Sequence, residues 1–233
     1  METAFDELEG GPATLKFSSS RSVHKASAVS GAAPVSTVAP PPFSRRAEPA
    51  CNVVGFMACG LTGVLLMYAN TGWVDKAFIE FVIPHALCQG GVVQLLAAIW
   101  SLVRGHMLDA TFHMLWGGFW LAWGTLRVLR LQGVTWGPTS PDFATAQCLF
   151  LMEWTIVAIV MFLVARHKRP FAVRFAFGSL AVALALLALT PWTAAVGKIG
   201  AYVGMLSSSS FFYAGAAQLM FEVNSIRWWG MSA

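Results

Sequence analysis

Long apolar segments alternate with short polar breaks from about residue 52 to residue 224. Six of these segments hold about 20 residues or more, the length at which a helix crosses the apolar core of a bilayer, about 30 Å thick. Residues that end helices, such as Gly72, Gly105 and Pro191, lie between them. The pattern predicts an all-α membrane protein, a six-transmembrane-helix bundle, with helices over Asn52–Asn70, Ala77–Val103, Met107–Leu131, Phe143–Ala165, Phe171–Thr190 and Ala195–Val223.

The first 49 residues differ in composition from the rest. They are rich in Ser, Ala and Pro and poor in aromatic residues, so they cannot bury enough apolar surface to offset their chain entropy. Their start lacks the apolar core of a signal peptide, so the first helix is expected to act as its own insertion signal. The expected organisation is a disordered cytoplasmic tail over residues 1–49 and a six-helix transmembrane domain over residues 50–233.

Composition and charge support this interpretation. Apolar residues make up 57% of the chain and charged residues 11%, against about 25% in a soluble domain. Positive residues gather in one set of loops, at Arg104 and over residues 166–169, and fewer lie on the opposite side. Because cytoplasmic loops carry the excess of Lys and Arg, both termini are expected in the cytoplasm. The plasma membrane is the expected location, and no basic stripe suggests a nucleic-acid partner.

Small residues recur at four-residue spacing in two of the predicted helices. This spacing lets helix backbones approach closely in lipid, so tight packing within or between subunits is the first interpretation. A face that leaves room for a narrow pore is the second. The two sets are Gly55, Cys59 and Gly63 in the first helix, and Gly200, Gly204 and Ser208 in the last.

The third predicted helix is unusually aromatic. Trp116, Phe119 and Trp120 surround the pair Gly117-Gly118. Rings beside glycines can form a hydrophobic constriction, which gates by size and dewetting. The same stripe is also compatible with ordinary core packing or lipid contact.

Glu153 lies near the middle of the fourth predicted helix, with about ten apolar residues on either side. A charge at that depth costs several kcal/mol, so the side chain is expected to face a cavity or a partner, or to hold a proton. An interhelix hydrogen bond and a proton-coupling role are both open. Glu153 is the candidate for a proton-linked group.

Nothing in the sequence favours an enzyme, a metal site or a cofactor. His85 and His113 are single imidazoles on different helices, without Cys or carboxylate neighbours at ligand spacing, and are expected to be core histidines. The chain shows no Ser–His–Asp set, no phosphate-binding glycine loop and no carboxylate pair.

Four stretches, in this order, resemble motifs of the acetate uptake transporter family, which includes bacterial succinate–acetate permeases and fungal acetate transporters. The family patterns are G-(M/L)-T-T-x-L-L, G-G-x-x-Q, Y-G-x-F-W-L and an Ala-Gln pair, of which the third is the most specific. The matching stretches are Gly60-Leu61-Thr62-Gly63-Val64-Leu65-Leu66, Gly90-Gly91-Val92-Val93-Gln94, Trp116-Gly117-Gly118-Phe119-Trp120-Leu121 and Ala146-Gln147.

The resemblance implies a six-helix protomer assembled as a homohexamer, with a path for acetate through each subunit. In the family an aromatic residue of helix one, the tyrosine of the third motif and a leucine of helix five narrow this path. Here Cys59 stands at the first position, Trp116 at the second and Leu180, after Ser179, at the third. The family's N-P-A-P-L-G-L stretch keeps only Gly55, and Phe56 is a candidate to replace the displaced ring.

These observations predict a transporter or channel for acetate and similar short-chain monocarboxylates that works by proton symport. Succinate, a dicarboxylate, is a further candidate substrate. Its partners would be the carboxylate substrate, protons, the bilayer and further copies of the chain. The alternatives are a membrane sensor or scaffold that binds carboxylates, or partners through its N-terminal tail, without transport, and a pathway for ammonium or another small solute. The predicted path residues are Gly55, Phe56, Cys59, Gln94, Trp116, Phe119, Trp120, Ser179 and Leu180.

Overall fold

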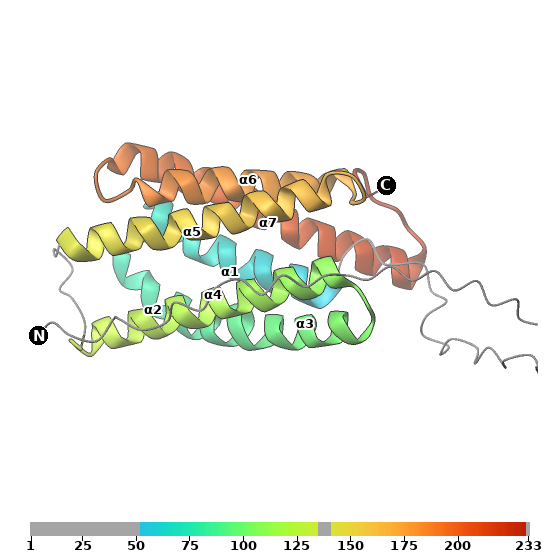
Figure 1. The fold of residues 1–233 in the computed structure, drawn as a ribbon, viewed down its shortest axis with the longest axis horizontal. Helices are drawn as coiled ribbons and strands as arrows, with labels where there is room; N and C mark the ends of the chain where they lie inside the picture. Colours follow the sequence, from blue (N-terminus) through green and yellow to red (C-terminus); the bar gives the residue numbers. More distant parts are fainter. Residues whose placement is uncertain (1–51, 135–140, 232–233) are drawn as a thin grey trace, which may run out of the picture. The chain divides into compact units, whose positions relative to one another are not determined.

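The structure, a computed structural model, describes residues 52–134 and 141–231. Within these residues the chain is helical and contains no strand (Figure 1). The tail predicted over residues 1–49 lies outside them. The helices are α1 (Val53–Thr71), η2 (Lys76–Phe78), α2 (Ile79–His85), η3 (Ala86–Val93), α3 (Gln94–Val103), α4 (Met107–Leu131), α5 (Pro141–Ala165), α6 (Phe171–Ala188) and α7 (Ala194–Asn224).

The six predicted helices are confirmed, with ends that agree to within about two residues. The second of them consists of η2 followed by the continuous run α2–η3–α3. Gly72 ends α1 in the left-handed conformation, with φ of 80°, which a residue without a Cβ adopts without strain. Asn52 caps the other end of α1, because its side chain accepts a hydrogen bond from the Gly55 N–H group.

Among the described residues, four helices are long and apolar enough to cross a membrane: Val53–Thr71, Ile79–Val103, Asp142–Ala165 and Phe171–Ala188. The hydrophobic pattern predicts six crossings, and the other two helices, α4 and α7, do not reach the same apolarity. Their composition explains the difference. Two arginines, a histidine and an aspartate lie in α4, and α7 is rich in Gly and Ser, whose side chains add little hydropathy.

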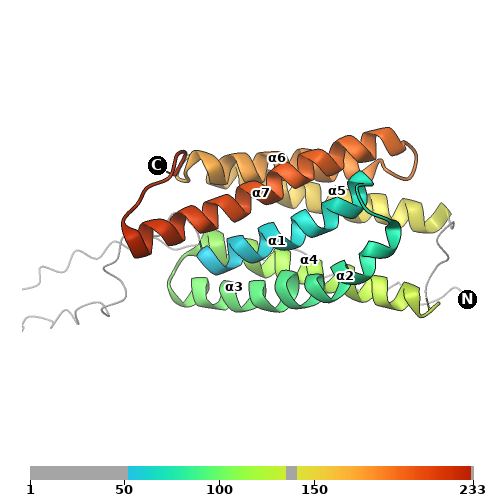
Figure 2. The ribbon, with the colours of Figure 1, turned by 180° about the vertical axis from the view of Figure 1, so that it is seen from behind.

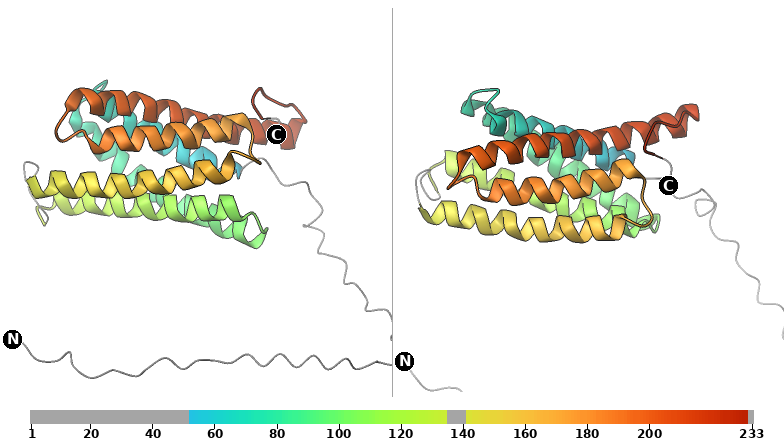
Figure 3. Two further views of the ribbon diagram at one scale, coloured as in Figure 1. Left: turned by 45° about the horizontal axis from the view of Figure 1, so that its top comes forward. Right: turned by 90° about the horizontal axis from the view of Figure 1, so that it is seen from above.

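The helices form two groups on either side of α1. Helix α7 packs along both α1 and α6, and α5 packs along α6 (Figures 2 and 3). On the other side α4 packs along α3 and η3. The backbones of α4 and α5 approach each other at few places. Side chains therefore have to fill the space between these two helices.

The second helix contains a π-helical stretch, Ala86–Val93, that begins two residues after Pro84. Proline removes a backbone donor and crowds the preceding turn, which disturbs regular α-helical bonding. The π stretch carries Gly90 to the Trp120 ring, where an added Cβ would lie 2.6 Å from Cγ of the indole. Isolated π segments are frequent at functional sites.

Small residues let α1 and α7 pack closely, and of the six residues that the spacing singles out, Gly63 and Ser208 meet in this contact. A Cβ on Gly60 would lie 2.5 Å from the Phe212 backbone nitrogen. A Cβ on Gly63 would contact the Ser208 side chain. Only glycine fits at these positions without moving one of the two helices.

Candidate functional site

A cavity of about 330 Å³ lies inside the bundle. We call the end of the bundle at which α1, α4 and α6 finish the distal end, and the opposite end the proximal end. The cavity extends from the middle of the helices toward the distal end, where Asn70, Gln147 and Thr190 line it. Five helices contribute its walls, α1, α4, α5, α6 and α7, whereas α2, η3 and α3 contribute none.

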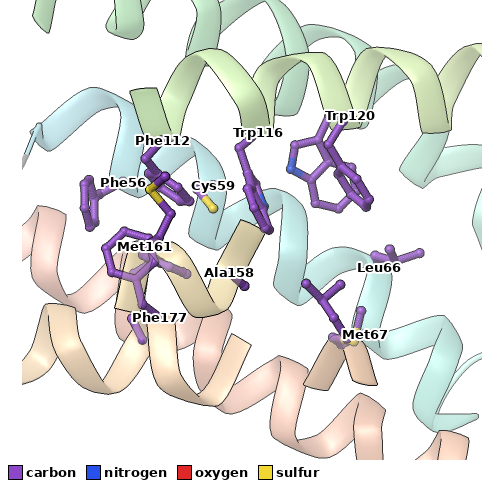
Figure 4. Packing of buried hydrophobic residues seen from close by; sticks show 14 of the residues in the cluster. Phe56, Cys59, Leu66, Met67, Phe112, Trp116, Trp120, Ala158, Met161 and Phe177 are labelled. Carbon is purple, nitrogen blue, oxygen red and sulfur yellow. The ribbon is translucent and has the colours of Figure 1, made fainter. Parts of the chain in front are cut away.

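Five of the nine predicted path residues line this cavity. The three positions that the resemblance singles out, Cys59, Trp116 and Leu180, come from α1, α4 and α6, and all three line the cavity. Figure 4 shows Cys59 and Trp116. Phe119 and Trp120 extend the aromatic wall from α4. Each of these side chains is buried or half-buried, and the wall they form is largely apolar.

The other four predicted path residues do not line the cavity. Gly55 packs against the His113 ring, which occupies the space that a Cβ would need. The Ser179 hydroxyl donates hydrogen bonds to the carbonyl groups of Phe175 and Ala176 in its own helix. Phe56 and Gln94 are fully buried on the proximal side and are described next.

Four phenylalanines from four helices close the proximal end of the cavity. Their ring centroids lie 4.8 to 6.3 Å apart, and none of the four is more than 1% exposed. We call this cluster the phenylalanine plug; Figure 4 shows three of its rings beside Trp116 and Cys59. Its members are Phe56 of α1, Phe112 of α4, Phe177 of α6 and Phe211 of α7.

Each of the three positions that the resemblance assigns to the constriction lies one helical turn distal to a plug residue. Cys59 follows Phe56 by three residues, Trp116 follows Phe112 by four, and Leu180 follows Phe177 by three. Three members of the plug, Phe112, Phe177 and Phe211, are not among the path residues predicted from the sequence. The available signal was a phenylalanine one turn before each constriction residue, but spacing along one helix does not show which rings of different helices meet.

Gln94 and His113 form a buried polar pair between α3 and α4. The Nδ1 atom of His113 lies 3.2 Å from Oε1 of Gln94, and both side chains are fully buried. The remaining nitrogen of each, Nε2, has no hydrogen-bond partner among the described residues. Toward the proximal end, Asn52 donates hydrogen bonds to the Ala97 carbonyl and the Ser101 hydroxyl. This arrangement agrees with a core histidine.

Aromatic side chains close the space between α4 and α5. The rings of Trp116 and Trp154 meet edge to face at 5.3 Å, and those of Phe119 and Phe150 stack at 5.5 Å with an interplanar angle of 15°. An ion pair of 3.1 Å joins Arg169 to the buried Asp109 at the proximal end of α4. These contacts seal the wall of the cavity that the helix backbones leave open.

Glu153 does not line the cavity. Its side chain is exposed on α5, among exposed apolar residues such as Met152 and Ile156. The expectation that Glu153 faces a cavity is thus excluded in this conformation. Its proton-linked role stays a prediction. Within the described residues no group of three or more His, Cys, Asp or Glu side chains could hold a metal ion.

Comparisons with known proteins agree with this architecture. Acetate permease A of Emericella nidulans is 29% identical over 184 residues, which are 74% of this chain and 62% of that protein. Ammonia transport outward protein 2 of Saccharomyces cerevisiae is 26% identical over 191 residues, 81% of this chain and 67% of that protein. The chain thus spans about two thirds of the length of these relatives.

The structure of the bacterial acetate channel SatP superimposes with a TM-score of 0.70. The match covers 81% of this chain and all of that one, at 24% sequence identity, and it therefore shows a shared fold. The sequence profile of the GPR1/FUN34/yaaH family matches residues 30–228, which include every helix described above. The chain belongs to the GPR1/FUN34/yaaH family.

Proposed function

We propose that this protein is a transmembrane transporter or channel for acetate and similar short-chain monocarboxylates. The observation that carries the proposal is the cavity that Cys59, Trp116 and Leu180 line, at the three positions that the resemblance assigns to the narrowing of the path. The names of acetate permease A and of the acetate channel SatP point to the same substrate. The function is transport through the bundle and not catalysis.

The proposal includes six membrane crossings. Helices of 25 and 31 residues, α4 and α7, are about 37 and 46 Å long at 1.5 Å per residue, more than a bilayer core requires. Several of their polar and small residues, such as Gly204, Ser208 and His113, face other helices or the cavity. A helix sheltered in this way needs less hydropathy than one in contact with lipid.

Orientation and assembly follow from the same reasoning. The proximal loops carry Arg104, Arg166, Lys168 and Arg169, so we place the proximal end and both termini in the cytoplasm, at the plasma membrane. The cavity then faces outward, and the phenylalanine plug separates it from the cytoplasm. By resemblance the protomers form a homohexamer, each with its own path.

Proton linkage is the finer part of the proposal. A carboxylate must shed water to pass the apolar wall, and passage as the neutral acid costs less free energy. Glu153 is the candidate proton-binding group. Because it is exposed on α5, it would act from the surface that α5 presents to lipid or to a neighbouring subunit.

The test is uptake of labelled acetate into liposomes that contain the purified protein. Trp116→Ala and Leu180→Ala are expected to change the uptake rate at least about tenfold, because both side chains line the cavity at positions that the resemblance assigns to the constriction. Unchanged rates in both variants would contradict the proposed constriction.

In the same assay Glu153→Gln is expected to flatten the pH dependence of uptake, and an unaltered pH profile would exclude Glu153 from the mechanism.

A carboxylate sensor or scaffold without transport is the second candidate. A cavity that is closed at the proximal end is also a binding pocket, and the four-ring plug favours this alternative. Protein that binds acetate but gives no flux in liposomes would support it.

Ammonium is a weaker third candidate, because the residues that line the cavity include one arginine and no acidic residue to hold a cation.

A further inference from the structure

The charge of the cavity is concentrated at its distal end. Of the residues that line the cavity, Arg127 of α4 alone carries a formal charge. The polar residues nearest to that end, Asn70, Gln147 and Thr190, are neutral. The inner wall is apolar and is built from rings and aliphatic side chains such as Trp120 and Leu184. The cavity is thus cationic at its mouth and apolar inside.

Aromatic rings hold Arg127 and its neighbour Arg130 in place. The Cζ atom of Arg127 lies 5.1 Å from the centroid of the Trp123 ring, and that of Arg130 lies 3.7 Å from the centroid of the Phe143 ring. Both rings line the cavity, whereas Arg130 itself does not. A guanidinium held over a ring loses little side-chain freedom when it binds a ligand.

Within the described residues no carboxylate lies close enough to pair with Arg127. The acid at the start of α5, Asp142, makes no ion pair with it, and the recorded ion pair, between Asp109 and Arg169, lies at the other end of the bundle. The Arg127 side chain is only half-buried, so its N–H groups are open to a solute that enters the cavity. A half-buried cation without an acidic partner is suited to an anionic ligand.

We infer that the distal half of the cavity is a binding site for a short-chain monocarboxylate anion, in which Arg127 binds the carboxylate and the apolar inner wall receives the alkyl chain. This inference rests on the proposed transport function and adds the residue that selects the anion. A planar guanidinium forms two parallel hydrogen bonds with a carboxylate, and at pH 7 a short carboxylic acid is almost fully ionised. Trp120 and Leu184 are suited to the methyl and methylene groups.

The test is equilibrium dialysis of labelled butyrate against the purified full-length protein in detergent at pH 7. Wild type is expected to bind butyrate, and Arg127→Gln is expected to weaken binding at least about tenfold, because a hydrogen-bonded charge is lost. Arg130→Gln is the matched control, since it removes the same charge one turn further along α4, outside the cavity. It is expected to change binding less than about threefold. Arg127→Lys should restore part of the affinity.

Several results would overturn the site. These are a wild-type protein that does not bind butyrate, equal weakening by Arg127→Gln and Arg130→Gln, and an Arg127→Lys variant as weak as Arg127→Gln. The partial recovery in Arg127→Lys guards against loss by misfolding. Uptake without Arg127-dependent binding would overturn this inference and leave the transport proposal standing. Arg127-dependent binding without uptake would support this inference and overturn the transport proposal.

Discussion

At the scale of single residues, the buried ring of α1 is Phe56, whereas the family resemblance implies an aromatic residue at position 59. A cysteine, Cys59, takes the position of the expected aromatic residue, and Phe56 closes the bundle one turn nearer the proximal end. The substitution of a small side chain at residue 59 leaves space inside the cavity. The closure is made by four mutually packed rings, which exclude water more completely than one ring among aliphatic neighbours would.

Removal of one plug ring should therefore increase flux. Phe177→Ala is expected to raise the acetate uptake rate by roughly tenfold, which corresponds to a barrier lower by about 1.4 kcal/mol. The matched control is Phe175→Ala, two residues away on the same helix and 37% exposed, which should leave the rate unchanged. Because a buried Phe→Ala change costs about 3–5 kcal/mol of stability, both variants need a size-exclusion profile like that of wild type. Equal rates in the two variants would show that the plug does not limit flux.

At the scale of elements, α4 and α5 lie on opposite sides of a gap that side chains have to fill. Their backbones approach little, and ring contacts with one ion pair supply the closure. The ion pair ties the loop after α5 to the first turn of α4, because Arg169 precedes α6 and Asp109 is the third residue of α4. The Asp109 and Arg169 side chains are 2% and 12% exposed, so water compensates little for a lost partner.

Asp109→Asn is consequently expected to destabilise the bundle. It leaves the Arg169 guanidinium without its charged partner, at a cost of about 3 kcal/mol in the free energy of unfolding. The measurement is the thermal unfolding midpoint in detergent. Asp142→Asn, at an exposed position in the first turn of α5, is the control and should change the stability by less than about 0.5 kcal/mol. Equal midpoints for the two variants would contradict the structural role of the ion pair.

Sequence patterns predicted the helices far better than their contacts. The bounds of α4 were predicted to the residue, because Gly105 and the polar stretch after Leu131 are strong end signals. The π stretch Ala86–Val93 was not predicted, since Pro84 indicates a disturbance but not its form. The position of Glu153 was also beyond sequence reasoning. All faces of α5 are similarly apolar, so the sequence does not show which face the other helices cover. That face depends on tertiary packing.

At the scale of the whole molecule, the cavity is asymmetric along the bundle. Five helices bring together a cationic mouth at Arg127, an apolar middle at Trp120 and Leu184, and a closed end at Phe177. Helix α4 contributes a residue to each part, Phe112, Trp120 and Arg127, and the other helices complete the walls around them. A solute with one charged end and a short apolar tail matches it, and a solute with charges at both ends does not.

Butyrate and succinate provide a matched test of this asymmetry, since both have four carbon atoms and differ in the number of carboxylates. Unlabelled acids would compete with labelled acetate for uptake at pH 7. From acetate to propionate to butyrate, the concentration for half-inhibition is expected to fall about fourfold per CH₂ group, the ratio for about 0.8 kcal/mol of apolar burial. Succinate should inhibit at least about tenfold less well than butyrate, because its second carboxylate would lie against Trp120 and Leu184 without a cation. Equal inhibition by butyrate and succinate would mean that the solute does not lie with its tail toward the inner wall.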